Sequence, residues 1–571
     1  MEIIEQIIRT LEHYVWTWGI PVGEETIPFL VIALLGTGLF LTLRLGLIQF
    51  RALGHGIAVT SGKYDDPDEP GDVPHFQALT TALSATVGIG NIAGVAIAVH
   101  WGGPGALFWM WITALLGMAV KFSEVTLAQH YRVVETGEQK GWKGSVSGGP
   151  MYYIERGLGK NWKPLAVFFA GALMITSFMT GNAVQANTIA DTVLDEFGWP
   201  VWATGLLTAS VVGVVILGGI SRIGKVTGIL APAMALIYLV GALTIIGLNA
   251  GEIIPTFGLI VTEAFNPSAG VAGTGAGAFL LTMMWGVRRG LFSNEAGQGS
   301  APIAHAAAKT DEPVSEGVVA LLEPFIDTII ICTMTGLVLL VTGVWNQPVP
   351  TTLVLDSGDI TYVKPNEFNI IGAGDAPEEI VITDGMPQAT ALGTSFAWHD
   401  VAIERFFTDE AQTVPFSGTL FPDRNVAVAT DGGELTTLYG SAVETGAPLT
   451  KLAFKQGLDE IGLGGLGEFI VLISVLLFGI STAISWSYYG DRCANYLFGA
   501  KGILPFKGVF VVMHFIGATV PLATIWVLGD VALGAVTFPN LIALLLLSGT
   551  LATLTRSYFE RKPWLSQPKK A

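Results

Sequence analysis

The chain has 571 residues, of which 51% are hydrophobic and only 13% are charged, and its mean hydropathy is +0.58. Soluble globular proteins carry about 25% charged residues, so this composition disfavours a cytosolic enzyme and indicates a polytopic membrane protein. The net charge of −17 disfavours nucleic-acid binding, which needs basic surface. The two cysteines, Cys332 and Cys493, form neither a disulfide framework nor a metal-ligand pattern.

Residues 1–25 lack the cationic start of a signal peptide. Their isoleucines and leucine recur on one helical face, and their charged residues fall on another. This pattern predicts an amphipathic helix at the membrane surface that ends at Trp16 and Trp18.

Apolar stretches long enough to cross a bilayer, about 20 residues each, follow this segment. Several of them are interrupted by glycine. We expect eleven spans, at residues 27–48, 76–99, 105–130, 164–190, 201–219, 227–248, 275–306, 318–345, 466–490, 506–527 and 531–553.

Lysine and arginine near the span ends predict the orientation. These residues concentrate in four segments, namely 131–163, 220–226, 491–505 and the tail from 554 to 571. All four fall on one side if the eleven spans alternate. The N-terminus is therefore expected outside, and the basic tail in the cytoplasm.

Residues 346–450 break the apolar pattern. They hold fifteen acidic residues, which only Lys364, Arg405 and Arg424 oppose, so this segment carries −12 of the net charge. The runs 351–355, 380–383 and 425–429 are typical of strands. The alternation of spans predicts an acidic, β-rich extracellular insert.

The span 76–99 contains Ser84-Ala85-Thr86-Val87-Gly88-Ile89-Gly90-Asn91, which is poor material for a continuous helix. A break would direct free carbonyls and N–H groups into the protein interior, where a small cation and a carboxylate could bind. A glycine face packed against a neighbouring helix explains this segment equally well.

The span 275–306 is interrupted in the same way by the run from Trp285 to Pro302, which includes two arginines, a glutamate and four glycines. Such residues are costly in lipid and are usually functional. Breaks at matching places in two five-helix halves indicate a transporter site near the membrane midplane, and they shift the interpretation toward a site.

Several runs resemble one transporter family. They are Gly102-Gly103-Pro104-Gly105-Ala106-Leu107-Phe108-Trp109-Met110-Trp111, Gly148-Gly149-Pro150-Met151-Tyr152-Tyr153, the run from Arg289 to Gly297, and Trp486-Ser487-Tyr488-Tyr489-Gly490. On these residues the chain resembles the alanine or glycine:cation symporters over nearly all its length outside 346–450. The insert is a departure, because a short extracellular connection is expected there.

The resemblance implies an all-α membrane protein with the leucine-transporter fold, in which two inverted five-helix repeats follow one extra N-terminal helix. The extra helix and its cytoplasmic loop would occupy residues 26–75, and the first repeat would occupy residues 76–250. The second repeat would occupy residues 275–345 and 465–553. The implied function is import of alanine or glycine coupled to sodium, with no other cofactor.

The resemblance also assigns substrate contacts. Val87, Gly88 and Asn91 would form the first binding break, and Trp285, Gly286 and Val287 the second. Gln185 would line the same site. Asn91 could instead bridge the broken backbone, Gln185 could join two helices by hydrogen bonds, and Trp285 could be ordinary core packing.

For sodium, the resemblance implies the hydroxyls of Ser481 and Thr482 together with carbonyls near Ser84, Ala85 and Val87. Both hydroxyls could instead bond back to their own helix.

Three further residues, Arg288, Arg289 and Glu295, are candidates for an inner gate or for a fixed buried network. Glu124, Glu323 and Asp327 could carry protons or ions, and helix capping or pairing explains them as well.

We therefore expect a multi-pass protein of a prokaryotic inner membrane that works as a monomer in the lipid bilayer, with no nucleic-acid partner. A proton-coupled transporter and an amino-acid sensor that uses the insert are the alternatives, and a channel ranks below them. The eight histidines and two cysteines provide no enzyme motif. The insert could cover the entrance, attract cations or serve as a salt-adapted surface, and we favour the last of these.

Overall fold

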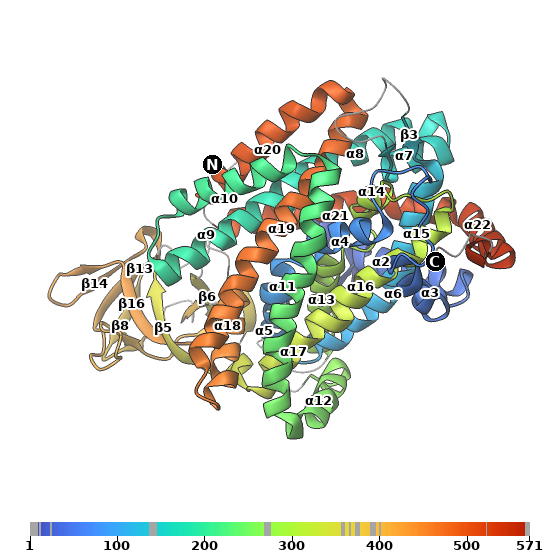
Figure 1. Cartoon of the computed structure of the whole chain (residues 1–571). Coiled ribbons are helices and arrows are strands. Elements are labelled where there is room, and N and C mark those ends of the chain that lie inside the picture. Colours follow the sequence, from blue (N-terminus) through green and yellow to red (C-terminus); the bar gives the residue numbers. More distant parts are fainter. Residues whose placement is uncertain are drawn as a thin grey trace.

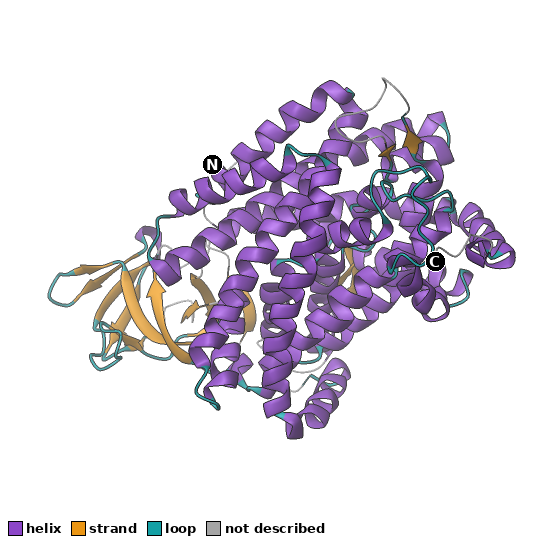
Figure 2. Cartoon of the chain, viewed as in Figure 1, coloured by secondary structure: helices purple, strands orange, loops and turns teal. Residues whose placement is uncertain are grey.

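The computed structural model of the chain is mostly helical (Figure 2). It describes residue 10 and residues 13–22, 25–135, 146–267, 276–355, 360–364, 367–371, 377–388, 395–398, 401–520 and 522–565. The helices form one elongated body, and the longer strands gather at one end of it (Figures 1 and 2).

The helices of the first half of the chain are α2 (Phe29–Arg44), α3 (Ile48–Thr60), α4 (His75–Thr86), η2 (Gly90–Gly94), α5 (Val95–Gly102), α6 (Ala106–Tyr131), α7 (Pro150–Gly157), α8 (Lys163–Phe178), η5 (Met179–Ala183), α9 (Val184–Phe197), α10 (Val201–Ile216), α11 (Ile220–Leu248) and α12 (Ile253–Phe265). Those of the second half are α13 (Ala276–Asn294), α14 (Ala301–His305), α15 (Pro313–Ala320), α16 (Leu322–Pro324), η7 (Phe325–Cys332), α17 (Thr333–Val341), α18 (Gly446–Asp459), α19 (Gly464–Phe498), α20 (Ile503–Gly517), α21 (Leu522–Leu546) and α22 (Ser548–Arg561).

Six helical stretches in the described residues are long and apolar enough to cross a membrane, and the count rises to nine if each of three bent pairs is one span. The bent pairs are α2 with α3, α4 with η2 and α5, and the later part of α21 with α22. Of the other expected spans, α10 is apolar but shorter, and α13 has 19 residues. The count of eleven stays a prediction.

Glycine lets the central helices pack closely. A Cβ built on Gly286 of α13 would lie 2.4 Å from the carbonyl oxygen of Ala106 in α6, and one on Gly290 would lie 3.1 Å from Thr113 Cβ. A larger side chain at Gly286 would push these two helices apart. The contacts of α6, α13 and α19 with their neighbours hold the two broken spans in the core of the body.

Two expected loops are helical instead. The segment 220–226 forms the first turns of α11, and α19 continues through Arg492 to Phe498. The Arg492 guanidinium is buried, where its Nε lies 2.7 Å from Asp491 Oδ1. Because this carboxylate also lies 3.0 Å from Lys507 Nζ, the helix can continue here with its charges paired.

Most of the expected N-terminal surface helix, residues 1–9 and 11–12, lies outside the described residues. The described residues that follow do not form a simple surface helix. A π-helical turn, η1 (His13–Thr17), precedes a hairpin of β1 (Gly19–Val22) and β2 (Glu25–Pro28). Trp18 is exposed, but Trp16 is only 5% exposed and packs inside the body.

The insert is built of antiparallel strands, as its sequence predicts. Its three sheets have the orders β12-β16-β5, β11-β10-β6-β7 and β15-β14-β13-β8-β9. The strands are β5 (Val349–Val354), β6 (Ile360–Lys364), β7 (Glu367–Ile371), β8 (Ile380–Thr383), β9 (Met386–Pro387), β10 (Ser395–Trp398), β11 (Val401–Ala402), β12 (Phe406–Phe407), β13 (Gly418–Phe421), β14 (Val426–Ala429), β15 (Glu434–Leu435) and β16 (Thr437–Ala442). A short pair, β3 (Val133–Val134) and β4 (Val146–Ser147), lies elsewhere in the body.

The insert has its own hydrophobic core, which is separate from the core of the helices. Its strands end at Ala442, and the following residues form α18, which lies along α19 in the helical body (Figure 1). The Thr450 hydroxyl of α18 donates to the Ile92 carbonyl of η2 at 3.1 Å. The segment after Ala442 is thus tied to the first broken span rather than to the strands.

Candidate functional site

The first broken span changes direction between α4 and η2. Val87 has an extended backbone (φ −73°, ψ 91°), and the two helical parts are bent by 54°. In an unbroken helix the Gly88 N–H would donate to the Ser84 carbonyl, but here it donates to Asn91 Oδ1 at 2.8 Å. The Ser84 carbonyl is therefore released from the helical ladder inside the protein.

Two hydroxyls of α19 meet the released carbonyl. Thr482 Oγ1 donates to the Ser84 carbonyl at 3.1 Å, and Ser481 Oγ donates to it at 3.4 Å. Ser481 also bonds back to the Phe478 carbonyl of its own helix at 2.9 Å, the alternative that its sequence left open, and its role as a sodium ligand stays a prediction. With the buried Ala85 next to Ser84, the break gathers oxygen atoms, which small hard cations prefer as ligands.

Gly88 lies between α19 and α9. A Cβ built on it would lie 2.7 Å from Thr482 Oγ1 and 3.7 Å from Gln185 Oε1. The Gln185 amide nitrogen donates to the Thr180 carbonyl at 3.1 Å, whereas Oε1 is buried and has no hydrogen-bond partner among the described residues. A buried acceptor without a donor is energetically unfavourable. Gln185 Oε1 is therefore suited to accept a hydrogen bond from a ligand beside the break.

The second break lies later in the chain than the sequence predicts. Helix α13 runs without interruption to Asn294, and a short connection then leads to α14. Positive φ angles occur at Glu295 (55°), Gly297 (91°) and Gly299 (77°). The backbone leaves the helix where these left-handed conformations begin.

Trp285, Gly286 and Val287 are therefore helical, and their expected place in a break is wrong. Gly286 serves close packing against α6, and Val287 is fully buried. The Trp285 ring stacks on Trp101 with 5.8 Å between ring centroids. It is the later part of α13 that meets the first break, since a Cβ built on Gly90 would lie 3.0 Å from Phe292.

Asn91 and Asp327 join the two broken spans. The Asn91 amide nitrogen donates to Asp327 Oδ1 at 2.7 Å and to Ser293 Oγ at 3.0 Å. The hydroxyls of Ser293 and Thr328 each donate to Asp327 Oδ2 at 2.7 Å. A fully buried carboxylate on η7 thus receives donors from η2 and from the end of α13.

Comparison with known proteins identifies the family. The sequence model of the sodium:alanine symporter family matches residues 1–358 and 426–570. The chain belongs to the sodium:alanine symporter family. The internal unmatched stretch, residues 359–425, lies within the β-rich insert, where a departure from the family is expected from the sequence.

Two relatives of this symporter family member are similar along nearly its full length, and a third over about three fifths of it. The sodium/alanine symporter AgcS of Methanococcus maripaludis is 39% identical over 557 residues, which is 97% of each chain. An uncharacterized transporter of Haemophilus influenzae is 37% identical over 98% of this chain and 97% of its own. The probable sodium/glutamine symporter GlnT of Bacillus subtilis is 34% identical over 61% of this chain and 68% of its own.

Among solved structures, the crystal structure of MhsT in complex with L-phenylalanine aligns with 85% of this chain and 99% of its own, with a TM-score of 0.45 and 12% identity. Family membership and the apolar helices make this chain a multi-pass membrane transporter and not an enzyme. The leucine-transporter topology stays a prediction.

The symporter's two adjacent arginines line a small cavity together with Trp16, Phe292 and Leu533. The Arg288 guanidinium lies 4.7 Å from the centroid of Trp16 and 5.5 Å from that of Trp285, and Arg289 lies 5.6 Å from that of Phe292. Glu295 contacts other groups: the Trp486 indole donates to it at 3.1 Å and the Ser300 hydroxyl also donates to it. The three gate candidates thus divide between this cavity and the second break.

The sequence analysis left Asp327 open and did not single out His75, Lys121, His305 or Glu316. All five are buried. The sequence does contain an indication of them, because ionisable residues within or beside apolar spans are usually functional. Spacing could not reveal which of them meet, because several of the pairs, such as His75 with Glu316 and Lys121 with Glu323, are more than 200 positions apart in the sequence.

Proposed function

We propose that this protein is a symporter that couples inward movement of sodium to import of a small neutral amino acid, alanine or glycine. The released Ser84 carbonyl carries this proposal, because it joins the first break to the Thr482 and Ser481 hydroxyls of a distant helix. The coupling ion would bind there, with the carbonyls of Ala85 and Val87 as further ligands.

The substrate would bind at the adjacent Gly88. The available acceptor Gln185 Oε1, 3.7 Å from a Cβ built on Gly88, suits an ammonium group. Phe292 packs against Gly90 on the other side and restricts the space to a small side chain. The two ligands would thus share Gly88 and Thr482 as neighbours, which is a physical basis for coupling their binding.

Asn91 would hold this geometry rather than select the substrate. Its amide oxygen accepts from the Gly88 N–H and its amide nitrogen donates to Asp327 and Ser293, so it fixes the first break against η7 and the end of α13. The bridging role that the sequence left open is the one that these contacts favour.

Transport would follow from alternating access around this site, with the N-terminus outside and the tail in the cytoplasm of a prokaryotic cell. Rather than at an inner gate, Arg288 and Arg289 would act on the outer side of the break, where Trp285 stacks on Trp101 and would close the path. Glu295 would act at the second break.

The test is uptake of labelled amino acids by proteoliposomes that contain the purified protein. We expect accumulation of alanine and glycine when sodium is higher outside, and little of phenylalanine or glutamate. Replacing sodium by potassium is expected to abolish accumulation. Equal uptake in potassium would contradict sodium coupling, and uptake driven by a proton gradient alone would favour the proton-coupled alternative.

A further inference from the structure

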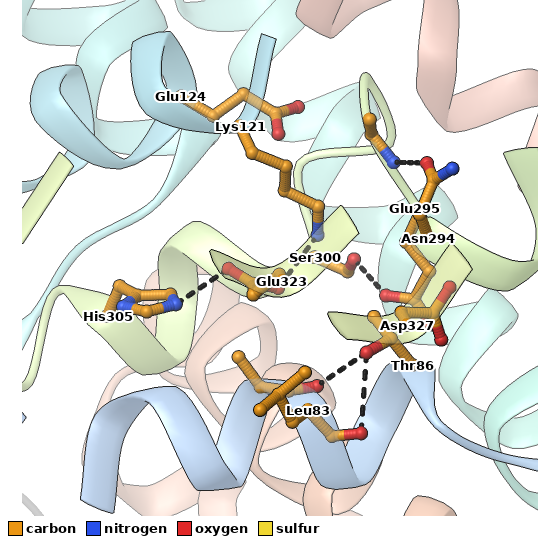
Figure 3. Close-up of polar contacts among 12 residues, drawn as sticks. Leu83, Thr86, Lys121, Glu124, Asn294, Glu295, Ser300, His305, Glu323 and Asp327 are labelled. Carbon is orange, nitrogen blue, oxygen red and sulfur yellow. Dashed lines mark hydrogen bonds and ion pairs between the residues drawn. The ribbon is translucent and has the colours of Figure 1, made fainter. Parts of the chain in front are cut away.

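Seven buried ionisable residues form a continuous group on the side of the molecule where α4 begins. They come from five helices and from the second break, and each is at most 4% exposed. We name them the latch cluster: His75, Lys121, Glu124, Glu295, His305, Glu316 and Glu323. Figure 3 shows the inner part of the cluster, with Lys121, His305 and Glu323 converging.

Direct contacts link five members in a chain. Glu316 bonds to Nδ1 of both His75 and His305. His305 Nε2 lies 2.7 Å from Glu323 Oε1, and Lys121 Nζ lies 3.2 Å from Glu323 Oε2 (Figure 3). A single line of ion pairs therefore runs from the first turn of α4 to the middle of α6.

The other two carboxylates hold the second break. Glu124 accepts the Gly299 N–H at 3.1 Å and the Asn540 amide, while its Oε2 is buried without a hydrogen-bond partner among the described residues. Glu295 accepts the Ser300 hydroxyl and the Trp486 indole. Both carboxylates also lie within electrostatic range of Lys121.

The charges of the latch cluster balance only if it holds protons. Four carboxylates face one lysine, so the net charge is −3 with neutral histidines and −1 with both histidines protonated. A buried net charge is strongly disfavoured. Protonation of both imidazoles and of one carboxyl group, for which the unpartnered Glu124 Oε2 offers a place, would make the cluster neutral.

Charged and titratable groups around the cluster do not remove this imbalance. They come from the segment before α4, the end of α6, and α7, α19 and η7. They are Asp65 and Glu69 facing His75, Arg132 facing Glu316, Tyr153 facing Glu124, Tyr489 facing Glu295 and Glu323, and Asp327 facing Lys121. Their carboxylates outnumber their single arginine and increase the demand for protons.

We propose that the latch cluster is a proton-binding site that fastens the inner halves of the two broken spans together while its histidines are protonated. His75 begins the first broken span, and Glu295 begins the connection that forms the second break. Loss of the His75 proton removes the positive charge that faces Glu316, Asp65 and Glu69, and this releases α4. Only the assignment of this side to the cytoplasm rests on the proposed function.

It follows that the latch cluster binds more protons when α4 is attached to it (closed) than when α4 is released (open). Closure is then stabilised at low pH, and opening becomes easier as pH rises. If opening releases one proton, the opening equilibrium rises about tenfold per pH unit. Under the proposed function, cytoplasmic acidification would slow substrate release.

Amide hydrogen exchange of α4 in lipid nanodiscs measures the opening of α4 directly. The measurement would run from about pH 6 to about pH 9, a range that includes histidine titration. After correction for the chemical exchange rate, we expect the protection of residues 75–86 to fall by up to about tenfold per pH unit. Protection of α20, which lies outside the cluster, should stay constant and serves as the internal reference. Constant protection of α4 in the wild-type protein would overturn the proposal.

His305→Gln is expected to reduce this pH dependence, because it removes one of the two titrating groups. His130→Gln is the matched control, since His130 is exposed at the end of α6 and should retain the wild-type profile. If His305→Gln does not fold, His75→Gln at the edge of the cluster provides the same comparison. A folded variant at either position with the wild-type profile would contradict the proposal.

Alanine uptake with only the internal pH varied separates this proposal from the proposed function. A pH-dependent protection of α4 without any sodium-driven uptake would contradict the proposed function and leave the latch intact. Normal sodium-driven uptake with pH-independent protection would overturn the latch alone.

Discussion

Single side chains account for the geometry of the first break. The side-chain amide oxygen of Asn91 replaces the Ser84 carbonyl as the acceptor of the Gly88 N–H, and this exchange makes the Ser84 carbonyl available to Thr482. The amide nitrogen of the same residue contacts Asp327. One asparagine therefore both shapes the break and attaches it to the second half of the chain.

Asn91→Ala is expected to abolish uptake and to lower the free energy of unfolding by about 1–3 kcal/mol, because it leaves the buried Gly88 N–H without its acceptor and removes one of the donors to Asp327. Asn249→Ala is the control, since the Asn249 side chain donates only to the Ile245 carbonyl of its own helix. Uptake assays and thermal unfolding measure the two effects. A stable Asn91→Ala protein that transports normally would contradict the bridging role.

Gly88→Ala is expected to reduce alanine uptake by about 10–200-fold, the effect of one methyl group in a tight pocket. Its Cβ would lie 2.7 Å from Thr482 Oγ1, in the space that we assign to the ligands. Gly171→Ala is the matched control, because nothing lies within 4 Å of a Cβ at that position of α8. Unchanged uptake in Gly88→Ala would exclude Gly88 from the pocket wall.

At the scale of the elements, the second break depends on backbone that only glycine adopts easily. Gly299 has φ +77°, and a Cβ built on it would lie 2.4 Å from Pro150 and 2.9 Å from Phe169. The connection after α13 is therefore fixed both by its dihedral angles and by its packing against α7 and α8.

Gly299→Ala is expected to destabilise the protein more than Gly462→Ala, which has a similar φ of +72° but no atom within 4 Å of its Cβ. The left-handed backbone alone costs about 1–2 kcal/mol, which is the expected effect at Gly462. Overpacking adds about 1–3 kcal/mol at Gly299. Thermal unfolding in detergent compares the stabilities of the two variants. Equal losses of stability would show that Pro150 and its surroundings move aside without an energetic cost.

At the scale of the whole molecule, the acidic insert is a separate β-rich unit whose two ends lie side by side. Val349 of β5 pairs directly with Ala442 of β16. Adjacent antiparallel residues can be joined by a two-residue turn. The insert can therefore be removed without moving α17 or α18.

Replacing residues 350–441 by Asn-Gly is expected to leave sodium-driven uptake and its salt dependence within about twofold of the wild-type values, because the helical core is separate from the core of the insert. Uptake assays at low and high salt provide the measurement. A large loss of uptake would indicate that the insert serves the entrance, and a loss only at low salt would indicate that its charge attracts cations.

Much of the fold and part of the site could be predicted from the sequence. Apolar length predicts the spans, and the weak helix-forming residues around Gly88 predict the first break. The strand-like runs of the insert coincide with β5, β8 and β14. The position of the second break could not be predicted, because glycines interrupt the apolar pattern both at Gly286 and at Gly297, and the close packing of Gly286 against α6 is not visible in the sequence.

The contacts of Asp327 and of the latch cluster could not be predicted either. Asp327 meets Asn91 across 236 positions of the sequence, and His75 meets Glu316 across 241. Local patterns carry no information on such pairs. The sequence indicated only that these charges are costly in an apolar span.

The central claim is that a cation binds between the released Ser84 carbonyl and the hydroxyls of α19. Its most direct test is the sodium concentration for half-maximal alanine uptake in Thr482→Val, with Thr244→Val as control, because the exposed Thr244 bonds only within its own helix. We expect at least a tenfold rise for Thr482→Val, about 1.4 kcal/mol, and no change for Thr244→Val. An unchanged sodium dependence in a folded, active Thr482→Val protein would contradict the account.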